Sequence, residues 1–275
     1  MTDFTIMELG FLLGTVILSA IFAGIMAGLL GVGGGIVLVP MLFWMLSLSD
    51  FPSGIFMHMA VATSLSTIMF TSMSSAWAHN KRGAIDLKLL RLWAPAMMLG
   101  ALSGGLVSRY IGADELKAIF GIIALLVAAN MARPKPLVLS DDLPESRIAH
   151  IAISGVTGLF SSLMGIGGGT LSVPILSAFS VEIRRAVGTA SAFGVVIAVP
   201  AVIGFVLSGL GVEGRPPLSL GYVNIAAALV ILPFTVGFAP VGARIAHSVD
   251  TKWIKRAFAF FLFITAIRML TSAFG

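Results

Sequence analysis

Long apolar runs, separated by short polar or glycine-rich breaks, make up most of this chain of 275 residues. Several runs reach the roughly 18 residues with which an apolar helix crosses the core of a bilayer. A transmembrane barrel would instead show alternating segments of about ten residues, and none appear. The pattern therefore predicts an all-α, polytopic membrane protein. We expect ten helical segments, at 8–30, 35–48, 56–78, 88–109, 116–132, 148–164, 169–180, 186–208, 218–243 and 253–273.

A polar stretch at 133–147, with three prolines and three acidic residues, divides these segments into two groups of five. We therefore expect a first membrane repeat at 1–132, a linker at 133–147 and a second membrane repeat at 148–275. The repeats match in several blocks: 60–64 with 186–190, 95–104 with 233–242, and 116–120 with 254–258.

Four glycines interrupt the first apolar run, in Gly31-Val32-Gly33-Gly34-Gly35, and the pattern recurs at 165–169. A proline follows each at the same distance, Pro40 and Pro174. An interior glycine costs a helix about 1 kcal/mol relative to alanine, so each run must break there. In lipid, a broken helix is tolerated only where protein or a water-filled cavity covers it. Each repeat therefore opens with a glycine-broken hairpin, and the segment lengths leave open whether it spans the bilayer or re-enters.

Charged residues in equivalent loops have opposite bias in the two halves. The loop after the third segment is basic in the first half and nearly uncharged in the second, and the loop after the fourth segment reverses this. The halves are therefore expected to be inverted repeats. With the linker in the cytoplasm, thirteen Lys and Arg residues lie on the cytoplasmic side of the membrane. Four lie on the external side or near that side: Arg109, Lys117, Arg215 and Arg268. Both termini are then external.

Composition excludes most other classes of protein. The chain is 58% hydrophobic and only 11% charged, where a soluble domain carries about 25% charge. The net charge of +5 comes from short loops, so it indicates topology and not a nucleic-acid partner. Cysteine is absent, and the four histidines lack metal-site spacing. We find no phosphate-binding loop, no nucleophile elbow and no zinc-protease helix, and we expect neither enzyme activity nor a cofactor.

The two glycine stretches point to an anion site. Helices that restart after the glycines expose unpaired N–H groups and the positive end of their dipoles. Inverted repeats with broken helices are typical of secondary transporters, with the substrate near the midplane. Hydroxyls of the third segment of each half can add neutral donors. The candidate binding residues are Gly31, Gly33, Gly34, Gly35, Thr63, Ser64, Gly165, Gly167, Gly168, Gly169, Thr170 and Thr189. The alternative is that the glycines only let helices pack closely.

The sequence Gly-Leu-Leu-Gly-Val-Gly-Gly-Gly-Ile-Val-Leu-Val-Pro at 28–40, echoed at 163–174, resembles the sulfite exporter TauE/SafE family. The blocks at 60–64 and 83–86 extend the likeness. The resemblance implies a transporter of a small anion, sulfite or an organosulfonate, in the bacterial inner membrane. The second half departs from the pattern, with Gly-Arg-Pro-Pro at 214–217 and Ala190 where the first half has Ser64. An assembly subunit and a channel-like anion facilitator remain alternatives, and the anion, coupling ion, direction and oligomeric state stay open.

The inverted topology makes a direct prediction. Single cysteines placed in the 80–91 and 247–256 loops of this cysteine-free chain should react with an impermeant maleimide from the same side of the membrane. Labelling from opposite sides would refute the inverted arrangement.

Overall fold

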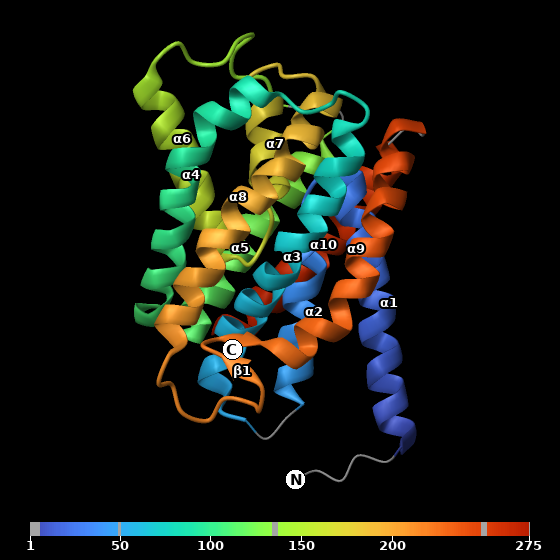
Figure 1. Ribbon diagram of the computed structural model, residues 1–275, viewed down its shortest axis with the longest axis vertical. Helices are drawn as coiled ribbons and strands as arrows, with labels where there is room; N and C mark the ends of the chain where they lie inside the picture. Colours follow the sequence, from blue (N-terminus) through green and yellow to red (C-terminus); the bar gives the residue numbers. More distant parts are fainter. Residues whose placement is uncertain (1–5, 49–50, 134–136, 249–251, 275) are drawn as a thin grey trace.

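The computed structural model describes residues 6–48, 51–133, 137–248 and 252–274, and they form an all-helical bundle (Figure 1). Ten α-helices match the ten predicted segments. They are α1 (Ile6–Leu30), α2 (Gly35–Ser47), α3 (Phe56–Asn80), α4 (Leu87–Val107), α5 (Ala113–Ala132), α6 (Arg147–Leu163), α7 (Gly169–Ala178), α8 (Ile183–Gly209), α9 (Ile225–Ser248) and α10 (Lys252–Phe274). Two 3-10 turns, η1 (Ser53–Ile55) and η2 (Ser108–Tyr110), precede α3 and follow α4.

One predicted boundary is wrong. The expected segment at 218–243 begins with a short antiparallel hairpin, β1 (Ser219–Leu220) and β2 (Val223–Asn224), so the helix starts only at Ile225. Gly221 makes the turn with a positive φ of 56°, and Pro216-Pro217 precede it. Apolar composition alone did not reveal this break, because Leu220, Tyr222 and Val223 continue the apolar run through the hairpin.

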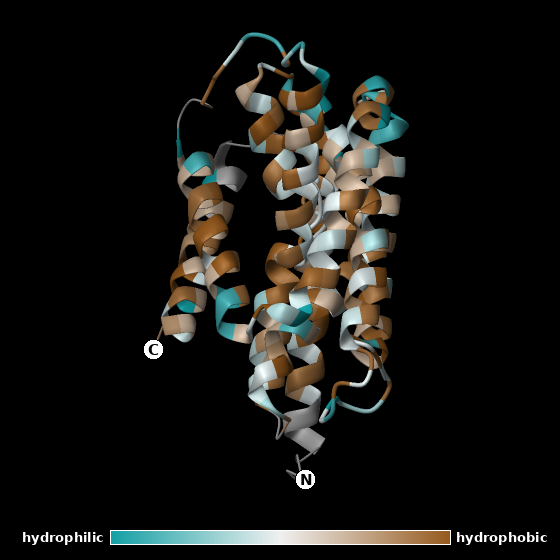
Figure 2. Cartoon of the chain, turned by 90° about the vertical axis from the view of Figure 1, so that its left-hand side faces the viewer, coloured by the Kyte–Doolittle hydropathy of each residue, from teal (hydrophilic) through white to brown (hydrophobic). Residues whose placement is uncertain are grey.

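Over the part of the chain that the structure describes, six helices are long and apolar enough to cross a bilayer: α1, α3, α4, α5, α8 and α9. Hydrophobic residues cover the lengths of the helices, while hydrophilic ones gather at the two ends of the bundle (Figure 2). The chain is therefore a multi-pass membrane protein, as its sequence predicts. The described helices α2 and α7, which follow the glycine stretches, are too short to span.

Helices α3 and α8 lie against each other at the centre of the bundle, and the other helices pair around them. Helix α1 packs along α9, α4 along α6, and α5 along α10. The backbones of α1 and α9 approach closely at Gly28, where an added Cβ would overlap the carbonyl oxygen of Ala239. Trp93 of α4 joins two neighbours: its indole N–H donates to His150 Nδ1 of α6 at 3.0 Å, and its ring stacks on Phe193 of α8 at 5.6 Å.

The bundle has two distinct ends. The terminal end holds the start of α1, η1, η2 and the β hairpin, at the bottom of Figure 1. The linker end holds the turn at 81–86, the linker and the loop at 179–182, at the top. The α1–α2 hairpin enters from the terminal end and returns to it, whereas the α6–α7 hairpin enters from the linker end and returns there. The glycine turns of the two hairpins, at 31–35 and 165–169, are both buried inside the bundle.

Close helix packing at Gly28 predicts a strong steric effect. Gly28→Ala should destabilise the protein by about 1–3 kcal/mol, because the new methyl group forces α1 away from α9. Gly14 of the same helix faces open space, so Gly14→Ala should be neutral or stabilising by up to about 1 kcal/mol. Thermal unfolding of the purified protein in detergent measures both. Equal effects of the two substitutions would contradict this packing.

Candidate functional site: the meeting point of the glycine turns

The structure brings the two glycine stretches into direct contact. The backbone N–H of Gly167 donates to the carbonyl of Val32 at 3.2 Å. A Cβ on Gly35 would overlap the carbonyl oxygen of Gly165, and one on Gly169 would overlap that of Gly31. Side chains at these positions would therefore hold the turns apart.

Backbone conformation gives the first turn a further need for glycine. Gly31, Gly33 and Gly34 have φ values of 69°, 73° and 84°, a region that residues with a Cβ rarely adopt. In the second turn Gly165 has such a value, 67°, whereas Gly168 is helical with φ −54°. The first turn thus depends on glycine for its shape, and the second mainly for its contacts.

Ser64 of α3 fastens the second turn to the centre of the bundle. Its hydroxyl donates to the carbonyl of Gly165 at 2.8 Å, and both groups are buried. The residue at the matching position of α8, Ala190, has no hydroxyl to do the same for the first turn. Ser64 therefore contacts a glycine turn, and its expected role in substrate binding stays a prediction.

Thr63 and Thr189 make equivalent contacts, each with a backbone N–H directly before another helix. Thr63 Oγ1 accepts the backbone N–H of Asn224, directly before α9, at 2.9 Å. Thr189 Oγ1 accepts the backbone N–H of Asp86, directly before α4, also at 2.9 Å. Asp86 in turn caps α4, since its carboxylate accepts from two N–H groups of the first turn. Each threonine thus ties the start of one helix to the central pair.

Four buried hydroxyls near the second turn have no hydrogen-bond partner among the described residues: Ser72 of α3, Ser161 of α6, and Thr170 and Ser172 of α7. Leaving a buried polar group unpaired costs about 1–3 kcal/mol. Ser72 Oγ lies against Gly194, and Gly194 lies beside the backbone nitrogen of Gly168. The unpaired hydroxyls therefore flank the start of α7.

The start of α7 adds unpaired N–H groups to these hydroxyls. Its first intrahelical bond runs from the N–H of Ser172 to the carbonyl of Gly168 at 2.8 Å. The N–H groups before it have no carbonyl one turn back within the helix, and the helix dipole makes this end positive. At the positions of Thr170 and Ser172, the first turn has Ile36 and Leu38. The chemistry of the site is therefore concentrated on the second turn.

Of these four unpaired hydroxyls, the sequence analysis named Thr170 as a candidate and did not name Ser72, Ser161 or Ser172. The position of Ser72, two helical turns after Ser64 on the same face of α3, was an available signal. Ser172 follows Thr170 by two residues and lay within the recurrent motif.

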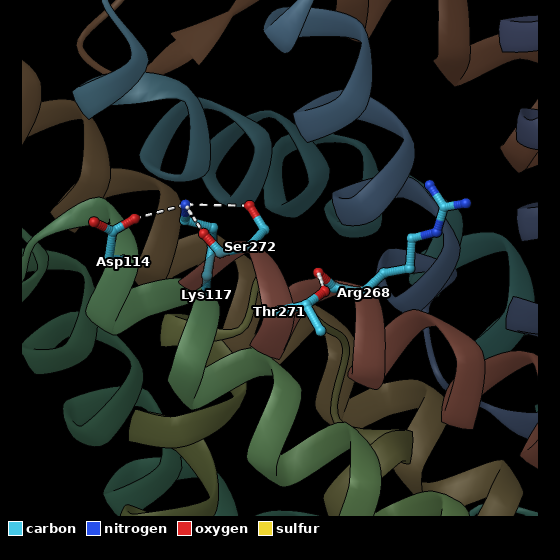
Figure 3. Close-up of polar contacts among 5 residues, drawn as sticks. All are labelled: Asp114, Lys117, Arg268, Thr271 and Ser272. Atoms are coloured by element: carbon cyan, nitrogen blue, oxygen red, sulfur yellow. Dashed lines mark hydrogen bonds and ion pairs between the residues drawn. The ribbon is translucent and has the colours of Figure 1, made fainter. Parts of the chain in front are cut away.

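A second polar feature, Lys117 of α5, lies at the terminal end beside a cavity of about 450 Å³. Its ammonium pairs with Asp114 at 2.6 Å and donates to the carbonyl of Ser272 of α10 at 2.8 Å (Figure 3). It also lies 5.4 Å from the ring of Phe43 of α2. Arg268 points away from this group. Lys117 thus joins three helices in the lining of the cavity.

The four histidines lie in three places, with His79 and His247 in contact with each other, and among the described residues they form no metal-binding group. His58 stacks on Tyr222 at 4.8 Å, and its Nε2 contacts the carbonyls of Ser108 and Ile111 at 3.0 Å. Burial raises the pKa of Tyr222 above its usual value, while Arg109 and Arg215 act in the opposite direction. These groups hold the β hairpin against the terminal end of α3.

Comparison with known proteins identifies a single family. The model of the family described as sulfite exporter TauE/SafE matches residues 16–269. A probable membrane transporter protein of Haemophilus influenzae is 32% identical over 250 residues, which cover 90% of this chain and 94% of that protein. Probable membrane transporter proteins of Methanocaldococcus jannaschii (MJ0441) and Bacillus subtilis (YunE) are each 28% identical and cover 94% and 85% of this chain, 96% and 88% of their own lengths. No solved structure matches.

The two threonine contacts predict matched losses of stability. Thr63→Val and Thr189→Val should each lower the free energy of unfolding by about 1–3 kcal/mol, since each leaves a backbone N–H without its acceptor. Thr271, whose exposed hydroxyl bonds to Arg268 within α10, is the control. Thr271→Val should change stability by less than about 0.5 kcal/mol. Thermal unfolding in detergent measures the stability of the three variants. Equal changes in all three would show that the contacts of Thr63 and Thr189 contribute nothing specific.

Proposed function

The chain belongs to the sulfite exporter TauE/SafE family, and we propose on that premise that it carries sulfite or an organosulfonate between its two glycine turns. It is a multi-pass membrane transporter and not an enzyme. The finer assignments, namely the anion, its site, the inverted relation of the halves and the orientation in the membrane, form the proposal.

Thr170 carries the proposal of the site. Its side chain is 2% exposed, has no hydrogen-bond partner among the described residues, and sits on the first turn of α7. A bound oxyanion would accept from this hydroxyl, from the N–H groups at the start of α7 and from Ser72. It would thereby remove the cost of burying them unpaired. The substrate would thus be held mainly by the second turn, with the apolar first turn closing over it.

Transport requires the two turns to separate, because they touch in this conformation. The α1–α2 and α6–α7 hairpins enter from opposite ends of the bundle, so a shift of one or the other would open the site to one end at a time. This is the alternating access expected of inverted repeats. A negative-inside potential favours exit of an anion by about 2.3 kcal/mol per charge per 100 mV. Export can therefore proceed without a built-in ATPase.

The orientation in the proposal follows from the basic residues at the linker end. Lys81, Arg82, Lys88, Arg91, Arg133, Arg147, Arg184 and Arg185 belong to the turns, linker and helix ends there. Positive residues mark the cytoplasmic side. We therefore place the linker in the cytoplasm and both termini outside, in the bacterial inner membrane.

The close contact of the turns also favours the second candidate, an assembly subunit whose glycines serve packing alone. Substituting the glycines does not separate the two candidates. A Cβ on Gly34 or Gly168 would lie only 2.9 Å from Ala23 O or 2.6 Å from Phe193 Cβ, so either change disrupts the fold under both. The unpaired hydroxyls do separate them, since packing needs no hydroxyl.

The test is sulfite flux in proteoliposomes containing the purified protein. Thr170→Val and Ser72→Ala should each reduce the flux about tenfold while leaving thermal stability unchanged or improved, because each removes an unpaired group. Thr157→Val is the matched control: Thr157 is also 2% exposed, but its hydroxyl bonds to the carbonyl of Ile153. Wild-type flux in all three variants would overturn the proposed site. An absence of flux in the wild type would favour the assembly subunit.

A further inference from the structure

Three helices meet at a histidine pair at the linker end. His79 of α3 is 1% exposed, and its Nε2 lies 2.8 Å from the carbonyl oxygen of Gly28 of α1. Its Nδ1 lies 3.2 Å from Nε2 of the half-buried His247 of α9. Gly28 precedes the first glycine turn by three residues. The pair therefore connects the linker end of the bundle with the hairpin that closes over the proposed site.

The partners of the two rings determine where a proton can bind. The carbonyl of Gly28 can only accept, so Nε2 of His79 carries a hydrogen and its Nδ1 accepts from Nε2–H of His247. Nδ1 of His247 then remains the basic nitrogen of the pair. One proton can be added there without breaking either hydrogen bond. A second proton, on His79, would break the contact between the rings.

The charged groups around the pair are positive. Arg82, on the turn after α3, acts electrostatically on both histidines, and Arg184, at the start of α8, acts on His247. Neither Arg82 nor Arg184 pairs with a carboxylate among the described residues. The carboxylate of Asp86, on the same turn as Arg82, pairs with Arg185 at 3.2 Å. Lys81 lies over the ring of Trp77, 3.6 Å from its centroid.

Among the residues that the structure describes, the remaining elements packed against the pair add no negative charge. Arg244, one turn before His247 on α9, is exposed. From Gly10 to Leu30, α1 has no ionisable side chain. Protonating His247 therefore adds a positive charge to a positive cluster, which is unfavourable until an anion arrives.

We propose that His247, Arg82 and Arg184 form an anion-capture site at the linker end, at which one proton and one sulfonate or sulfite anion bind together. The proposal rests on the function proposed above and adds that binding of the anion is linked to binding of a proton. The guanidinium groups and the protonated imidazole donate to the oxygens of the anion, and the anion offsets the added charge. Linkage is reciprocal, so the anion favours protonation as much as the proton favours the anion. The site delivers the anion beside the last turn of α1.

The test is calorimetric titration of methanesulfonate into the full chain in nanodiscs. This anion stays ionised at all relevant pH values, so any pH dependence belongs to the protein. Binding at pH 7 should take up protons, measured by repeating the titration in buffers of different ionisation enthalpy. The dissociation constant should fall about fivefold or more from pH 8 to pH 6, a common size for coupled binding.

His247→Gln is the informative variant, because the amide N–H can still donate to His79 but cannot take up a proton. It should bind methanesulfonate without proton uptake and with little pH dependence. Arg184→Gln should weaken binding at both pH values, whereas the control Arg185→Gln, which removes the partner of Asp86, should not. Proton uptake that persists in His247→Gln, or is absent from the wild type, would overturn this inference and leave the proposed function standing. Failure of the wild type to bind at any pH would overturn both.

Discussion

The rest of the structure depends on the contact between the two glycine turns. Each turn breaks a helix inside an apolar bundle, where the backbone has no water to satisfy it. The N–H of Gly167 and the carbonyl of Val32 satisfy each other across the contact, and Ser64 satisfies Gly165 from the central helix. The bundle thus covers the broken backbone with protein, the condition under which lipid tolerates such a break. The central position of α3 and α8 follows, because both turns must reach them.

The two halves supply unequal parts of this centre. The first turn has three glycines in left-handed conformations and is followed by Ile36 and Leu38, so it is shaped by its backbone and lined by apolar groups. The second is followed by Thr170 and Ser172 and is flanked by Ser72. The predicted duplication would account for the two turns, and divergence of the two copies for their different surroundings. Under the proposed function, one half holds the anion and the other covers it.

The helices were predictable from the sequence because apolar runs and their breaks are local signals. The ten segments, the glycine breaks and the family resemblance all rest on residues close together in the chain. The hairpin at 219–224 was missed because its strands are only two residues long and lead directly into the next apolar helix. At the candidate site, the motif predicted the glycines and Thr170, but no pattern predicted the partners of Thr63 and Thr189. Those partners lie 161 and 103 residues away. His79 and His247 are separated by 168 residues, so no local pattern joins them.

The same contact has a consequence for biogenesis. Gly167, which satisfies the carbonyl of Val32 in the first turn, lies about half a chain away, between α6 and α7. The N-terminal half emerges first from the ribosome. When α1, α2 and α3 enter the membrane, the carbonyl of Val32 has neither Gly167 nor the second hairpin to cover it. The first half is thus inserted as an unfinished structure that the second completes. Assembly of the two halves is part of the folding of each, and a truncated first half would leave its broken helix facing lipid.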